Sequence, residues 1–152
     1  MKKEIYGDIS ATDDLHAFEF VSVGKKGLIS KQVLFIPNEE PGIYDLEFGD
    51  IKADGSIDYF AISNNGDTNK ILATIMKIID IYTRKYPDRN ISFFGNTAER
   101  IRLYRMAIGL NLEELSKLFD IYTKEDKKFI LFARDTNATK FLIKRKRPNF
   151  NL

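Results

Sequence analysis

Apolar and polar residues alternate along the first third of the chain, which predicts β-strands. Large apolar residues at every second position mark a strand at 17–23, and apolar runs follow at 31–36, 43–48 and 57–62. A hairpin turn at 24–27, rich in glycine and lysine, separates the first two strands. Turn signals recur between all four runs, and this spacing favours an antiparallel meander.

The apolar period then changes to that of an amphipathic helix. Apolar side chains three and four residues apart predict a helix over 68–86, which Asp67 or Thr68 caps and Pro87 ends. A short buried strand is expected at 91–94.

A second helix is expected after this strand. Asn96 or Thr97 caps it, it runs to about Ile108, and Gly109 occupies the position after its last residue. Asn111 followed by Glu114 resembles a capping box, which predicts a short third helix over 112–118. Three more strands complete the chain, at 119–122, 129–133 and 141–144.

This order of elements predicts an α+β fold. We expect a single domain over 1–152, with a largely antiparallel sheet covered by the helices at 68–86 and 98–108, and a basic tail at about 144–152. The expected core consists of apolar residues from both helices and the strands: Phe18, Phe20, Leu46, Phe48, Ile71, Ile75, Ile79, Phe93, Ile101, Tyr104 and Ile108.

Composition excludes several classes of chemistry. The chain of 152 residues has no Cys, which rules out disulfides, zinc–thiolate sites, iron–sulfur clusters and cysteine nucleophiles. Its single histidine, His16, stands at the start of a strand and is interpreted as a structural or surface residue. No apolar run is long enough to span a membrane and the first residues lack the apolar core of a signal peptide, so a cytoplasmic protein is expected.

Charge is segregated along the chain although the net charge is only +2. The span 39–58 is acidic, whereas 84–105 and 140–147 are basic. This asymmetry permits an anionic ligand, a nucleic acid or self-association, and a homo-oligomer or a protein partner is expected. The acids of 45–58 do not follow the spacing of a calcium loop, and we interpret them as the solvent face of a sheet with no metal site.

Two polar turns that precede the helices are candidate anion-binding sites. Asn64, Asn65 and Gly66 tolerate a left-handed backbone, so this turn can present N–H groups immediately before a long helix. The alternative is a simple Asn-Gly turn with Asp67 as a cap. Asn96 occupies the equivalent place before the second helix.

The second helix adds cationic and phenolic side chains to this picture. Arg102 and Arg105 are neighbours on one face, whereas Arg100 faces elsewhere. Tyr104 belongs to the apolar stripe, but its hydroxyl can still reach a cleft. Binding-site and scaffold interpretations of these four residues both stay open.

The segments 18–24, 63–67 and 95–105 together resemble a bacterial family of uncharacterised proteins of this length. That resemblance covers nearly the whole chain and implies no activity. The order of strands, turn, helix, strand, Asn and helix with Leu-Tyr is also similar to the latter part of the GNAT acyltransferase fold. This second resemblance implies coenzyme A as cofactor, its pyrophosphate at Asn65-Gly66-Asp67, a following Asn at Asn96, and Tyr104 as general acid.

Three functions are therefore carried forward. Because the residues alone show no acid–base pair, nucleophile or metal cluster, a non-catalytic binding or interaction module is the leading hypothesis. A GNAT-like acyltransferase that binds coenzyme A is the alternative. Nucleic-acid binding is the third, through cations of the middle and end of the chain: Arg84, Lys85, Arg89, Arg102, Arg105 and 144–147.

Overall fold

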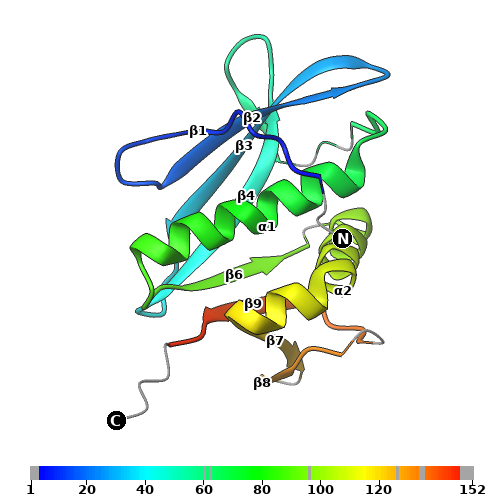
Figure 1. Ribbon diagram of the computed structural model, residues 1–152. Coiled ribbons are helices and arrows are strands. Elements are labelled where there is room, and N and C mark those ends of the chain that lie inside the picture. The colour runs from blue at the N-terminus through cyan, green and yellow to red at the C-terminus, as the bar shows by residue number, and fades with distance from the viewer. Residues whose placement is uncertain are drawn as a thin grey trace.

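Two helices lie against one face of a single sheet in the computed structural model, which describes residues 4–59, 61, 63–95, 97–125, 127–133 and 136–147 (Figure 1). This is the α+β fold that the sequence predicts. The strands are β1 (Ser10–Ala11), β2 (Ala17–Gly24), β3 (Gly27–Pro37), β4 (Ile43–Ile51), β5 (Ile57–Asp58), β6 (Asn90–Phe94), β7 (Phe119–Glu125), β8 (Lys128–Leu131) and β9 (Lys140–Arg145), and the helices are α1 (Thr68–Lys85) and α2 (Ala98–Leu118).

The sheet has the strand order β1-β2-β3-β4-β6-β9-β7-β8, and β5 pairs with β4. All neighbours are antiparallel except β4 and β6, which run parallel. A parallel pair needs a crossover connection, and α1 supplies it by crossing in front of the sheet between the two strands (Figure 1). The chain therefore divides into an N-terminal meander and a C-terminal half that are joined through β4 and β6.

The core lies between the helices and the sheet. Every expected core residue is buried except Ile101, which is partly exposed in the first turn of α2. Tyr82 of α1 stacks on Phe35 of β3 with ring centroids 3.8 Å apart. Phe93 of β6 stacks on Phe141 of β9 with ring centroids 5.5 Å apart. These contacts connect both halves of the sheet to the same core.

The predicted break at Gly109 is wrong, because α2 continues without interruption to Leu118 and includes the expected third helix. A glycine inside a helix costs only about 1 kcal/mol relative to alanine, and burial of Leu115 beyond it offsets that cost. The side chain of Asn111 is not a cap, since it donates a hydrogen bond of 2.6 Å to the carbonyl of Ala107 within the same helix.

Other boundaries differ less. The expected strand at 57–62 is the two-residue β5, and Phe60 and Ile62 of that span lie outside the described residues. β1 was not predicted, because two residues carry no periodic signal. Within the part of the chain that is described, neither helix is long and apolar enough to cross a bilayer.

Candidate functional site

The turn before α1 holds the β2–β3 hairpin in place. Asn65 is only 2% exposed, and its side-chain oxygen accepts a hydrogen bond of 2.6 Å from the backbone N–H of Lys26. Its amide nitrogen donates to the Ser22 hydroxyl and to the Gly27 carbonyl, both at 3.0 Å. The Asn65 side chain therefore serves the fold, whereas Asn64 and Gly66 are exposed, with φ of 48° and 84°.

Asp67 occupies the N-cap position of α1 but makes no side-chain capping hydrogen bond. One of its carboxylate oxygens instead accepts from the Ser22 hydroxyl at 2.5 Å and from the Tyr6 hydroxyl. Burial and this carboxylate raise the pKa of Tyr6. The carboxylate thus points into the protein and accepts no hydrogen bond from the backbone N–H groups in the first turn of α1. These N–H groups carry partial positive charge. Lys25 lies beside Gly66 and adds a cation at this end of the helix.

The parallel strands β4 and β6 pair over only three residues and then separate. The pairs join Ile43 to Asn90, Tyr44 to Ile91 and Asp45 to Ser92. Further along β4, Asp50 and Ile51 pair with β5 instead. Between these two pairings, residues 46–49 of β4 have no strand partner on the β6 side among the described residues. Side chains can therefore enter the space beside them.

A small pocket of about 60 Å³ lies in this gap. It is lined by side chains from both strands, from α2 and from the segment after β5: Leu46, Glu47, Phe48, Tyr59, Phe94 and Tyr104. Ligands of open sheets with parallel strands bind beyond the carboxyl ends of those strands, where the connections diverge, and this pocket has that position. β6 ends, and α1 and α2 begin, on the same side of the molecule (Figure 1).

Titratable groups in the pocket have shifted pKa values. Burial, and the negative charge of Asp45, raise the pKa of the Glu47 carboxyl, while Arg100 acts against this rise. Burial raises the pKa of the Tyr104 hydroxyl, Arg100 acts against this rise, and the negative charge of Glu47 adds to it. Burial and Glu47 also raise the pKa of Tyr59. The pocket therefore combines a carboxylate that holds a proton more readily than usual with phenols that keep theirs.

Arg100 supports the pocket from the first turn of α2. It is only 2% exposed, donates a hydrogen bond of 3.1 Å to the Ala61 carbonyl, and lies over the Phe48 ring at 4.8 Å. Its guanidinium also lies close to the Tyr104 hydroxyl. Its buried Nε has no partner among the described residues. Thr97 caps the helix as predicted, with its side chain accepting from the Arg100 N–H.

The three arginines of α2 do not converge. Arg102 is exposed, and Arg105 donates to the Thr136 carbonyl at 3.2 Å, away from the pocket. Asn96 lies outside the described residues. Of the predicted site residues, the structure thus brings Arg100 and Tyr104 together, while Asn64, Asn65 and Gly66 form a separate turn at the start of α1.

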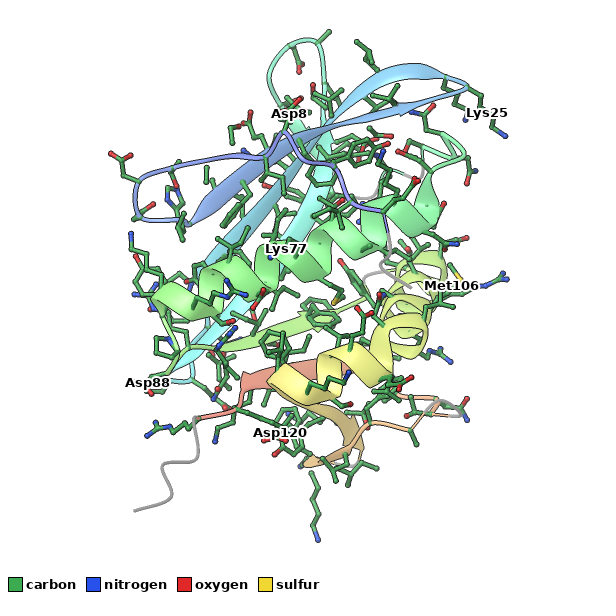
Figure 2. The ribbon with its side chains drawn as sticks, in the orientation of Figure 1. Asp8, Lys25, Lys77, Asp88, Met106 and Asp120 are labelled. Carbon is green, nitrogen blue, oxygen red and sulfur yellow. The ribbon has the colours of Figure 1, made fainter. Side chains whose placement is uncertain are left out.

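The cations proposed for nucleic acid divide between two regions. Met106, next to Arg105, and Asp88 lie on opposite sides of the molecule in Figure 2. Near Asp88, a groove of about 460 Å³ is lined by residues from the ends of both helices and β9: Arg84, Pro87, Lys117, Leu118, Arg145, Lys146 and Arg147. Arg84 and Arg145 both bind Asp80, at 3.0 and 2.9 Å, and Arg147 binds Asp88 at 2.7 Å. Much of this positive charge is therefore neutralised within the protein.

Contrary to the sequence prediction, the acidic residues of 45–58 do not all lie on a solvent-exposed face of the sheet. Asp50 pairs with the buried Lys31, and Lys31 also donates to the Ser63 hydroxyl at 2.7 Å. Within the described residues, no three His, Asp or Glu side chains gather as a metal site. His16 is exposed and contacts Asp14 at 2.5 Å.

Glu47 and Tyr59 were not singled out from the sequence. A glutamate between Leu46 and Phe48 on a strand matches the ordinary alternation of a sheet with one wet face. No local signal distinguishes Glu47, because a further predicted strand at 57–62 separates it from the polar turn before the helix. Its proximity to Tyr104 depends on the packing of α2, which periodicity does not specify.

A family model matches residues 2–146, which include every strand and both helices described above. The chain belongs to DUF6934. This is a family of unknown function, so the predicted membership of an uncharacterised family is confirmed and DUF6934 spans the whole fold. Searches of curated proteins and of solved structures found no match, and the GNAT resemblance is thus not supported by a known structure.

Proposed function

We propose that this member of DUF6934 binds a coenzyme A thioester and transfers its acyl group. The observation that carries the proposal is the separation of β4 and β6 after Asp45 and Ser92, where a pocket brings Glu47 and Tyr104 together. The sequence favoured a non-catalytic module because it showed no acid–base pair. The packing of α2 against β4 places a carboxylate and a phenol in one pocket. We therefore prefer acyl transfer to the non-catalytic module.

The residues present fit such a ligand in two places. The first turn of α1 has N–H groups that the Asp67 side chain does not cap, with Lys25 nearby, and this combination suits a pyrophosphate. The edge of β4 at 46–49 offers backbone groups to the amide-containing arm of the coenzyme. When bound, the coenzyme supplies a thioester whose carbonyl carbon accepts a nucleophile.

The chain's own groups have complementary acid–base roles. Glu47, with its raised pKa, accepts a proton from the attacking group, because a base is most effective when its pKa approaches the working pH. Tyr104 keeps its proton at neutral pH and donates it to the departing sulfur. Arg100, whose guanidinium lies close to the phenol and acts on its pKa, is a positioning residue. The buried Leu46 and Phe48 supply apolar lining to this pocket.

Ligand binding is the first test. Acetyl-coenzyme A at about 1 mM should raise the melting temperature by mass action, and Lys25→Glu should reduce the shift. Lys52→Glu, on the exposed β4–β5 turn, is the matched control and should leave the shift unchanged. No shift with the wild-type chain would eliminate the coenzyme.

Catalysis is tested separately by release of the free thiol in the presence of small amines. Glu47→Gln and Tyr104→Phe should lower that rate by about 100-fold or more while retaining the thermal shift. A bound coenzyme whose rate of thiol release is unaffected by both substitutions would instead support the non-catalytic binding module.

A further inference from the structure

One face of the sheet carries no helix in the described part of the chain. Both helices lie on the opposite face in Figure 1. Strand register identifies the side chains of this open face, because Val21 lies opposite Ser30, and Val23 opposite Leu28, while the alternate positions Phe18 and Phe20 enter the core.

Exposed apolar side chains occur in both halves of this open face. Val21, Val23 and Leu28 lie on β2 and β3, and Phe94, Phe129 and Leu131 lie on β6 and β8. Leu28, Leu131 and Val23 are 74%, 67% and 57% exposed. Single exposed apolar residues are normal, whereas neighbouring ones mark an interaction surface, and the register makes Val23 and Leu28 cross-strand neighbours.

Charged side chains on the open face are separated by sign. The register places Glu19 opposite Gln32, Glu47 opposite Leu34 and Asp45 opposite Ile36, so three acids lie on the half formed by β2, β3 and β4. The other half, formed by β6, β9, β7 and β8, carries lysines instead.

On that second half, Lys140 lies opposite Phe94, Lys144 opposite Asp120, and Lys124 opposite Phe129. Asp120 is the one acid there within the described strands, and Lys146 lies 3.9 Å from its carboxylate. The open face is therefore acidic on one half and basic on the other, with apolar residues in both.

We propose that a second copy of this chain docks on the open face through a two-fold axis. In a two-fold dimer each contact occurs twice, so the acidic half of one protomer covers the basic half of its partner and the reverse. Two sheets pack face to face at about 10 Å, which brings the apolar side chains of both into one layer. A single surface patch thus supplies both sides of the interface.

This interface does not depend on the proposed acyl transfer, although the two share Phe94 and Glu47. Phe94 is half exposed on the open face and also lines the pocket. A partner on the open face covers that ring and shields the pocket from water on this side.

Charge-reversal variants with mixing provide the test. Glu19→Lys with Gln32→Lys makes the acidic half more positive, and Lys140→Glu with Lys144→Glu makes the basic half negative. Each variant alone should dissociate, with a dimer dissociation constant raised at least about tenfold in sedimentation equilibrium. Because the two variants carry opposite charges, mixing them should form a heterodimer, which native mass spectrometry detects.

A control applies the same change in charge elsewhere. Glu113→Lys with Ser116→Lys, on the exposed side of α2, should keep the wild-type dimer. Val21→Thr with Val23→Thr, which preserves strand propensity, should also weaken the dimer with little change in the melting curve. A wild-type chain that keeps its monomer mass of 17.6 kDa at about 100 µM, a level that detects even weak dimers, overturns the proposal. A dimer insensitive to both charge reversals, or variants that fail to pair on mixing, also overturns it.

Discussion

Replacing Asn65 with alanine tests whether the turn before α1 is a structural connection. The side chain of Asn65 makes three hydrogen bonds, to Lys26, Ser22 and Gly27, and is almost fully buried. Its backbone carbonyl accepts a fourth, of 3.2 Å, from Lys25. The substitution removes the first three, keeps the fourth, and leaves polar groups of the hairpin without their partner.

The expected cost follows from those contacts. A net hydrogen bond contributes about 1 kcal/mol, and a buried polar group left unpaired costs about 1–3 kcal/mol. Water can reach the hairpin backbone at the exposed Lys26 and Gly27, which recovers part of the loss. We therefore expect Asn65→Ala to lower the free energy of unfolding by about 2–4 kcal/mol.

Urea unfolding measures this cost, and hydrogen exchange locates it. The amide of Lys26 should lose protection in the variant, because Asn65 is its acceptor. Asn69→Ala is the matched control, since Asn69 is exposed on α1 and alanine favours helix, so stability should stay equal or rise slightly. A cost below about 0.5 kcal/mol for Asn65→Ala would refute the structural role and return its amide to the ligand interpretation.

Three other predictions concern the core, the β6–α2 connection and a buried charge. Ile75→Ala should cost about 2–5 kcal/mol on urea unfolding, because the side chain is buried under α1, and an effect below about 0.5 kcal/mol would contradict its placement. Gly95→Ala should destabilise the protein, since an added Cβ would lie 2.4 Å from the Ile101 backbone nitrogen, and a melting temperature equal to wild type would contradict this. Arg145, Arg84 and Lys77 hold the pKa of Asp80 below its usual value despite burial. Its ion pairs therefore stabilise the protein above about pH 4, and this contribution is lost as pH falls through the lowered folded-state pKa. Asp80→Asn should accordingly cost most stability at neutral pH and progressively less in acid, and a cost independent of pH would contradict the assignment.

Local patterns were sufficient for most of the fold. The 3.6-residue period predicted α1, and alternation predicted β2, β3 and β4, because each pattern reports the burial of one face. The break at Gly109 failed because a local stop signal was outweighed by burial of Leu115 in the following turns.

The site was less accessible to sequence reasoning. Arg100 and Tyr104 were recognised as candidates because they share a helix, but their meeting with Glu47 depends on a contact between α2 and β4 across the crossover. Asn65 was a candidate for ligand binding because a polar turn before a helix is typical of anion sites, with a simple structural turn as the alternative. Its actual partners belong to a hairpin distant in sequence, which no local pattern encodes.

The short parallel join between β4 and β6 has a consequence for how the chain folds. The N-terminal meander needs only hairpin contacts between consecutive strands, whereas Ile43 must meet Asn90 after the whole of α1 has been placed. Closing such a long loop is entropically costly before its contacts form. We therefore expect the meander to form early and the three-residue join to form late. The pocket beside this join is therefore completed only when the two halves of the sheet come together.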